Sequence, residues 1–271
     1  MSVEPKITKE LEAAEKKYKS LQPETFLAKD GKTLLAKLTF ENVAKIEALI
    51  RIDSRYHQDD SDQYFPYWIK ELGKHLGYLD GEIKVNDFPT VVENAVNKID
   101  SENSTRLNVD GGREWMMTKI KALADRGVIL DYLKKPEHKI ELIKILSTRT
   151  KKGGDRHLSF ASKFCHYACF YIFKGENAQD NFSPYDNVVV NILPKYLAYY
   201  EIADEKSARK DLNKNCYSKC EDYSELYKKY SEYIDNVIDF IGKSTGEYIS
   251  RNGFDHLLWY YFKSNPKTSD K

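Results

Sequence analysis

Apolar residues recur every three or four positions along most of the chain, a spacing that is typical of one buried face of an α-helix. In residues 39–56, for example, Val43, Ile46, Leu49 and Ile50 follow this period. Residues 6–20 combine strong helix formers with charges on the outer face. The pattern therefore predicts helices along nearly the whole chain.

No run of alternating apolar and polar residues predicts a convincing sheet. The best strand candidate is NVVVNI at residues 187–192, but the residues on both sides of it favour a helix. Average helix length then gives about ten to twelve helices for a chain of this size. The predicted fold class is all-α.

Prolines and glycines mark the expected ends of these helices. Pro66 begins a predicted helix over residues 65–79, and Gly77 lies near its end. Asp30-Gly31 is a turn signal that interrupts the segment around it. A further helix carries Lys163, and others are predicted over residues 87–102, 113–127, 136–150, 185–200, 222–246 and 251–263.

The overall composition limits the class of protein. The chain has 271 residues, of which 41% are hydrophobic and 31% charged, as in a globular protein rather than a disordered one. No apolar run approaches the roughly 18 residues that a membrane-spanning helix needs, so no membrane partner is expected. The N-terminus lacks the apolar segment of a signal peptide, and we expect a cytoplasmic protein. A formal net charge of +1 argues against a uniformly basic polyanion binder but allows a local basic surface.

Two groups of residues raise the question of a metal site. Cys165 with Cys169, and Cys216 with Cys220, form two pairs that are each spaced by one helical turn. Four thiolates can hold zinc, but cysteine is also a common buried residue. The acidic segment 53–62 lacks the glycine and closing glutamate of a calcium loop, and we interpret it as a surface loop. The expectation is therefore no metal and no cofactor.

The stretch HLSFASKFCHYACFYIF, residues 157–173, contains one lysine, Lys163, among mostly apolar and small residues. Such a lysine usually lays its stem along apolar surface and keeps its amine in water. Alternatively, apolar neighbours such as Phe160 and Phe164 remove water from the amine and favour its neutral, nucleophilic form. The surrounding motifs favour the second interpretation.

Two short elements carry a family resemblance. The first is Ser159-Phe160-Ala161-Ser162-Lys163-Phe164-Cys165, and the second is Phe182-Ser183-Pro184-Tyr185-Asp186, with Asp186 following Lys163 by 23 positions. Within residues 140–195 these elements resemble the helix-hairpin-helix DNA glycosylase superfamily, and in it the 8-oxoguanine DNA glycosylase-like branch. The segment 254–263 also looks like the C-terminal helix of bacterial members of this branch, and some similar bacterial chains resemble phage-defence proteins.

The resemblance implies a chemistry for Lys163 and Asp186. In this family the lysine amine attacks the sugar C1′ of a flipped-out nucleotide, the base departs, and a Schiff base forms whose elimination can nick the strand. Lys163 would be the nucleophile, and Asp186 would stabilise the cationic sugar and assist proton transfer. The expected function is a DNA glycosylase, with AP-lyase activity left open, that excises a damaged or modified base from double-stranded DNA.

The resemblance also implies an arrangement in space. We expect two helical lobes with a helix-hairpin-helix element and a cleft between them, in a protein that acts as a monomer. Residues 1–40 and 176–271 would form one composite lobe, and residues 41–137 the other. Residues 138–175 would form the helix-hairpin-helix element that carries Lys163.

Further residues are assigned to DNA contacts. Tyr167, Phe182 and Tyr185 are expected to face the extruded base. Candidates for contacts to the DNA backbone lie in the hairpin and the basic segment before it: Arg149, Lys151, Lys152, Gly154, Arg156, Ser159 and Ser162. Asn103, Asn108 and Arg113 are candidates for the wedge that fills the gap left by the base.

The chain departs from the family pattern at three positions. Ser159 and Ala161 stand where the hairpin has glycines, and Val188 stands where the family often has a histidine. Because glycine lets the backbone approach a phosphate closely, the alternative of a non-enzymatic nucleic-acid-binding or phage-defence interaction module on the same fold stays open. The identity of the base is open as well, with a modified phage base as one class.

Simpler structural roles also remain for the same residues. Asp186 precedes a helix and can serve as its N-cap. Tyr167 and Phe182 can belong to the core, and the basic residues before the hairpin can form a solvated loop.

Overall fold

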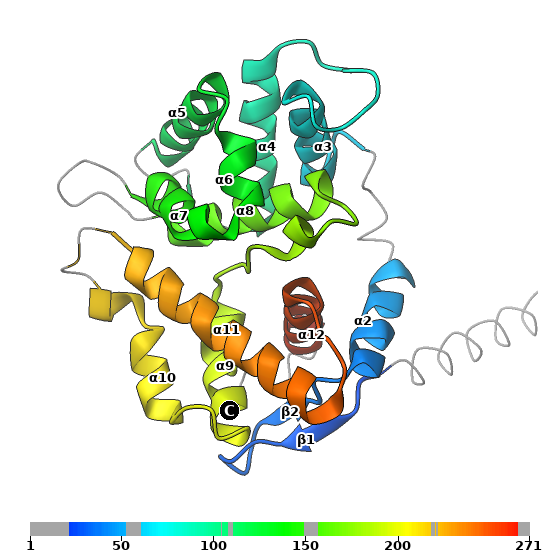
Figure 1. Ribbon diagram of the computed structural model, residues 1–271, viewed down its shortest axis with the longest axis vertical. Coiled ribbons are helices and arrows are strands. Elements are labelled where there is room, and N and C mark those ends of the chain that lie inside the picture. Colours follow the sequence, from blue (N-terminus) through cyan, green and yellow to red (C-terminus); the bar gives the residue numbers. More distant parts are fainter. Residues whose placement is uncertain are drawn as a thin grey trace, which may run out of the picture.

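The computed structural model describes residues 22–52, 61–103, 105–107, 111–148, 157–217, 220 and 222–264. Over these residues the chain is mostly helical (Figure 1), which confirms the predicted all-α fold class. The α-helices are α2 (Phe40–Ile52), α3 (Phe65–His75), α4 (Phe88–Asn103), α5 (Gly112–Asp125), α6 (Ile129–Lys134), α7 (Lys139–Ser147), α8 (Leu158–Ile172), α9 (Asn187–Tyr199), α10 (Glu205–Asp211), α11 (Ser224–Thr245) and α12 (Arg251–Ser264). The 3₁₀ turns are η2 (Pro136–His138), η3 (Asn177–Asp180) and η4 (Lys214–Tyr217).

Prolines and glycines mark helix ends much as the sequence predicts. Pro66 occupies the first turn of α3, where its missing N–H has no intrahelical partner to lose. Gly77 follows α3 and Gly127 follows α5 with φ of +70° and +68°, in the left-handed region that glycine adopts without strain. The strand candidate at residues 187–192 is helical and belongs to α9, which continues through Pro194.

A small antiparallel sheet is an element that the sequence pattern did not predict. Strand β1 (Thr25–Leu27) pairs with β2 (Leu34–Ala36). Between them, the Asp30 carboxylate accepts the backbone N–H groups of Lys32 and Thr33 at 2.9 and 2.8 Å and so closes the turn. Each strand has only three residues, so the alternation was too short to be visible, although the turn signal marked the right place.

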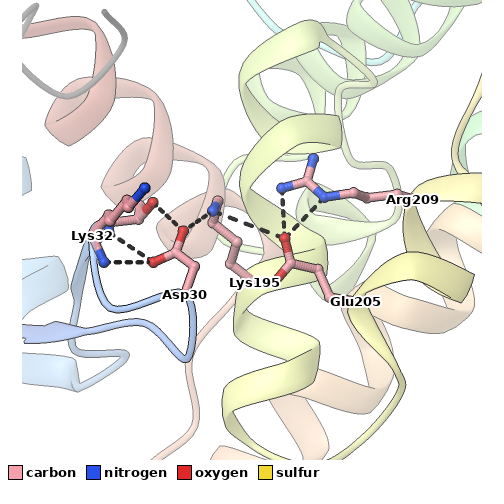
Figure 2. Close-up of polar contacts among 6 residues, drawn as sticks. Asp30, Lys32, Lys195, Glu205 and Arg209 are labelled. Carbon is pink, nitrogen blue, oxygen red and sulfur yellow. Dashed lines mark hydrogen bonds and ion pairs between the residues drawn. The ribbon is translucent and has the colours of Figure 1, made fainter. Parts of the chain in front are cut away.

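Charged side chains connect this hairpin to the helices beside it. Figure 2 shows Asp30 in contact with Lys195 of α9, whose Nζ also lies 3.9 Å from Glu205 of α10. Arg209 donates to the same Glu205 carboxylate at 2.7 Å. A surface depression of about 510 Å³ lies beside these residues, between the hairpin turn and α10. Because these side chains are partly exposed, their ion pairs contribute little to the stability of the fold. Their role is to orient the hairpin against α9 and α10.

The helices form two groups in Figure 1. Helices α3 to α8 lie together at the top of the view, with α3 packed against α4 and α8, and α7 packed against α8. The second group contains the β-hairpin, α2 and α9 to α12, with α12 packed against α2 and α9. Contacts between α7 and α11 join the two groups. The chain passes from one group to the other between α8 and α9, which places Lys163 and Asp186 near this junction.

Helix α2 lies in the second group, although nearly all of its residues fall within the range 41–137 that was expected to form the other lobe. Gly253 of α12 explains how the two helices fit together. A Cβ atom at this glycine would lie 2.9 Å from Cγ1 of Val43 in α2, so a larger residue would push the helices apart. A glycine in a predicted helix does not reveal which distant helix it faces, and the boundary at residue 41 therefore did not anticipate this contact.

Candidate functional site

The structure brings Lys163 and Asp186 together. Nζ of Lys163, on α8, lies 3.8 Å from Oδ2 of Asp186, which directly precedes α9. Their side chains are only 8% and 12% exposed, so the two charges lie largely out of water. The burial follows from α8 itself, because most of its residues face other helices. An amine and a carboxylate that are distant in the sequence thus share one shielded position.

Asp186 is also the N-cap of α9. Its Oδ1 accepts the backbone N–H of Val189 at 3.0 Å, and its own backbone is extended, with φ of −139° and ψ of 174°. The other carboxylate oxygen, Oδ2, faces Lys163. Asp186 is therefore both the cap of its helix and the ion-pair partner of Lys163.

Hydrogen bonds hold the segment that leads into Asp186. The Ser162 hydroxyl of α8 accepts the backbone N–H of Tyr185 at 2.9 Å. From α11, the Tyr227 hydroxyl donates to the Ser183 carbonyl at 3.0 Å, and the Tyr230 hydroxyl donates to the carbonyl of the next residue, a proline, at 2.6 Å. Because buried hydrogen bonds are costly to break, the Asp186 carboxylate is fixed from two sides.

The structure places the hairpin candidates in different environments. Ser162 is fully buried and its hydroxyl also donates to the Ser159 carbonyl at 3.2 Å, so it holds α8 and the residue 183–186 segment rather than facing solvent. Ser159 is half-buried. The remaining candidates lie outside the described residues: Arg149, Lys151, Lys152, Gly154 and Arg156.

Two of the three aromatic candidates belong to the core. Phe182 is 0% exposed and Tyr185 is 2% exposed, so neither ring presents a face to solvent in this structure. The Tyr185 hydroxyl donates to the Leu212 carbonyl at 2.6 Å, which satisfies it inside the protein. The apolar residues around Pro184 are buried because this short segment crosses between the two helix groups.

Tyr167 has a different environment from the other two aromatic candidates. Its residue is half-buried, its ring lies 4.3 Å from that of Phe65, and its hydroxyl donates to Oδ1 of Asn103 at 2.7 Å. The carboxyl groups of Asp255 and Asp186 act on it electrostatically, and burial raises the pKa of Tyr167. Tyr167 is thus the aromatic candidate that is not fully buried, and Phe65 is a neighbour that the sequence did not indicate.

Asp255 is a residue of the site that sequence reasoning missed. It lies on α12, and its Oδ1 is buried without a hydrogen-bond partner among the described residues. Burial raises the pKa of Asp255 well above its usual value, the Asp186 carboxylate raises it further, and the Lys163 amine opposes the shift. An acidic residue in the apolar helix of residues 251–263 was the available signal, but only packing shows that its Oδ1 is buried.

His166 also adjoins the site. Its Nδ1 lies 2.9 Å from the carbonyl oxygen of Phe182, and burial lowers the pKa of His166 to about 4. The ring is therefore neutral near pH 7. Lys214, from η4, interacts electrostatically with Lys163, and burial lowers the pKa of Lys214. The Lys163–Asp186 pair thus has a second amine, a second carboxyl group and a neutral imidazole in its electrostatic surroundings.

The three candidates for the wedge residue have different environments. Arg113 donates from Nε to Oδ2 of Asp100 at 2.9 Å and forms an ion pair with the same carboxylate, so its side chain is held against the protein. Asn103 accepts the hydroxyl of Tyr167. Asn108 lies outside the described residues.

The four cysteines do not come together. Cys165 and Cys169 are buried in the core, whereas Cys216 and Cys220 are exposed. Among the described residues, no group of three or more histidine, cysteine or acidic side chains has a spacing that could hold a metal ion. The acidic segment at residues 53–60 lies outside them.

Comparisons with known proteins add no assignment. No protein-family model matches this chain, and neither a curated protein nor a solved structure matches it. Within the described residues, none of the helices has the length and apolar character needed to span a membrane.

Proposed function

We propose that this protein is a DNA glycosylase, with the capacity for AP-lyase chemistry, in which Lys163 is the nucleophile and Asp186 is its carboxylate partner. The observation that carries the proposal is the Lys163–Asp186 pair itself. An amine and a carboxylate lie 3.8 Å apart with little exposure to water. A salt bridge on the protein surface requires no burial and no carboxylate oriented at a helix N-terminus, whereas the Lys163–Asp186 pair has both.

In the proposed reaction, a nucleotide leaves the duplex stack and its sugar C1′ approaches Nζ of Lys163. The neutral amine forms a bond to C1′ as the glycosidic bond breaks, and the base leaves with the bonding electrons. Asp186 stabilises positive charge on the sugar, because its carboxylate is held in place before the substrate arrives. The bound amine then loses a proton, and the C1′–O4′ bond breaks to give a Schiff base and an O4′ hydroxyl. Loss of a C2′ proton and of the 3′ phosphate from this Schiff base releases the strand end. The substrate class is double-stranded DNA with a damaged or modified base.

The surroundings of the pair support a fixed site rather than a mobile one. Ser162, Tyr227 and Tyr230 hold the segment that presents Asp186. Catalytic groups need to be held near their productive geometry by such supporting contacts. Tyr167 lies one helical turn after Lys163 on α8 and is only half-buried, and a base can stack on an aromatic ring of this kind.

A second candidate is a binding or interaction module without catalysis. The burial of Ser162 favours it, because a hydroxyl expected to contact a DNA phosphate is used inside the protein. In such a module Asp186 would only cap α9 and neutralise the charge of the buried Lys163 amine. The two candidates differ in what happens when Lys163 is replaced.

Borohydride trapping tests the proposal. The protein is mixed with duplexes that carry an abasic site, 8-oxoguanine or phage-type modified cytosines, the mixture is reduced, and a covalent protein–DNA band is sought. We expect a band with at least one duplex, its loss in Lys163→Gln, and its retention in Lys174→Gln, an exposed lysine just beyond α8. DNA binding by Lys163→Gln should fall less than about tenfold, since the amine acts mainly in the reaction.

Three other results are informative. Equal loss of binding and trapping in Lys163→Gln would contradict a catalytic role for this lysine. Base release without a trapped band would indicate a monofunctional glycosylase in which Asp186 activates a water molecule. Neither base release nor a band with any duplex would favour the binding module.

A further inference from the structure

Lys214 is a second amine beside the Lys163–Asp186 pair, and it comes from a different part of the fold. It is the first residue of η4, the short turn that follows α10. Its Nζ lies over the ring of Tyr185, at 5.1 Å from the ring centroid. Tyr185 directly precedes Asp186 in the chain. The Lys214 amine therefore lies against the segment that presents the Asp186 carboxylate.

Hydrogen bonds fix the segment that carries Lys214. The Tyr185 hydroxyl donates to the Leu212 carbonyl at 2.6 Å, two residues before Lys214. The Tyr185 backbone N–H donates to the Ser162 hydroxyl of α8 at 2.9 Å, so the ring beneath the amine is held as well. The contacts that place Lys214 are thus shared with the segment that leads into Asp186.

The Lys214 amine lacks an anionic partner within the protein as described. Among the described residues, no carboxylate lies at ion-pair distance from it. Its neighbours are instead the face of the Tyr185 ring and, electrostatically, the Lys163 amine. The residue is only partly exposed, and burial together with Lys163 lowers the pKa of Lys214. An anion that binds from outside would favour the charged form of this amine.

Asp186 balances one of the two amines rather than both. Its Oδ1 accepts the Val189 N–H, and its Oδ2 lies 3.8 Å from Nζ of Lys163. Lys214 therefore supplies a positive charge that the protein leaves for a ligand. In double-stranded DNA the charge of opposite sign is on the phosphates. Because these are bonded to the sugars, they reach the site together with the sugar that approaches Lys163.

We propose that Lys214 binds a DNA phosphate that flanks the extruded nucleotide, an inference that rests on the proposed function. The ammonium donates to a non-bridging phosphate oxygen and balances its charge. This contact holds the sugar near Nζ of Lys163. Lys214 makes no covalent bond and transfers no proton. It is a backbone contact from η4, separate from the candidates in and before the hairpin.

The salt dependence of DNA binding tests the contact. Dissociation constants are measured by fluorescence anisotropy from about 50 to about 200 mM salt, with a duplex that carries a tetrahydrofuran abasic-site analogue. We expect Lys214→Gln to bind more weakly, and the slope of log affinity against log salt to fall by about one, as for one lost phosphate contact. Lys210→Gln, an exposed lysine in the last turn of α10, is the matched control and should keep the slope. An unchanged slope in Lys214→Gln overturns the proposal.

Neutral phosphates locate the contact. A methylphosphonate replaces, one at a time, the phosphates on the two sides of the analogue. With the unaltered protein, one of these replacements should weaken binding by about tenfold or more, as for a lost charge-assisted hydrogen bond. With Lys214→Gln the same replacement should have little further effect, because the two changes remove the same contact. Weakening of equal size in both proteins, at both positions, overturns the proposal.

Controls for folding use two other substitutions. Lys214→Met keeps an apolar stem over Tyr185 and repeats the test if the glutamine variant does not fold, as judged by circular dichroism. Lys214→Arg keeps the charge and should keep the salt slope. A folded arginine variant that loses the slope as the glutamine variant does would overturn a charge contact.

The results are distinguishable from those for the proposed function, because the tetrahydrofuran analogue cannot form a Schiff base. A reduced slope and a coupled phosphate, with no trapping or base release from any duplex, support the Lys214 contact and count against the glycosylase. Trapping that depends on Lys163, with an unchanged slope in Lys214→Gln, supports the glycosylase and overturns the Lys214 contact. An unaltered protein that binds none of the duplexes overturns both.

Discussion

Asp186 has two tasks that substitution can separate. It caps α9 through Oδ1 and pairs with Lys163 through Oδ2. Asparagine is as good an N-cap as aspartate, so Asp186→Asn removes the charge and keeps the cap. Asp186→Ala removes both. Comparing the two variants therefore measures the cap and the charge independently.

The structure sets the expected magnitudes. Loss of the cap in Asp186→Ala should cost about 1 kcal/mol of unfolding free energy. Removing one partner of a buried ion pair usually costs about 3–5 kcal/mol, because the other charge is left unbalanced. We therefore expect Asp186→Asn to cost about 3–5 kcal/mol, and Asp186→Ala to cost about 1 kcal/mol more because it also removes the cap.

Urea unfolding at pH 7, followed by circular dichroism with linear extrapolation, measures these free energies. The decisive quantity is the coupling between Asp186 and Lys163, obtained from Asp186→Asn, Lys163→Gln and the double variant. Strictly additive costs would refute the argument that the two side chains form a buried pair. Both single variants at Asp186 should lose covalent trapping while they remain folded.

Three further predictions concern the scaffold and its pH dependence. Gly253→Ala should destabilise the protein by about 1–3 kcal/mol, because the new Cβ would lie 2.9 Å from Cγ1 of Val43. Gly242→Ala is the control and should not destabilise the protein, since the nearest atom to its new Cβ lies at 3.8 Å. Urea unfolding of both variants measures the two changes. Ser162→Ala should cost about 1–3 kcal/mol in the same assay, since it leaves a buried backbone N–H without its acceptor. The pKa of His166 is lowered to about 4, so its neutral form stabilises the fold above the unfolded-state pKa of 6.5, and this contribution falls as the pH drops from 6.5 towards 4. Unfolding free energies measured over this range should fall less steeply in His166→Gln, and equal slopes would contradict the assignment.

The sequence by itself determined most of the described helices and many of their ends, but not α6 or α10; the predicted helix over residues 6–20 lies outside the described residues. Pro66 at the start of α3 and Gly127 after α5 are local signals that act through backbone conformation, and the helical spacing of apolar residues marks the face of each helix that is buried. The short motifs around Lys163 and Asp186 also indicated that these two residues belong together. The three-residue strands of the β-hairpin were missed because they are too short to show an alternating pattern.

Only the tertiary structure decided what each side chain faces. Helical spacing cannot show that Gly253 meets Val43, that Ser162 holds the segment before Asp186, or that Phe182 is fully buried. It also cannot show that Asp255, from the last described helix, shares an environment with Lys163. These relations depend on how helices distant in the sequence pack, because burial and electrostatic interaction are set by neighbours in space rather than by neighbours along the chain.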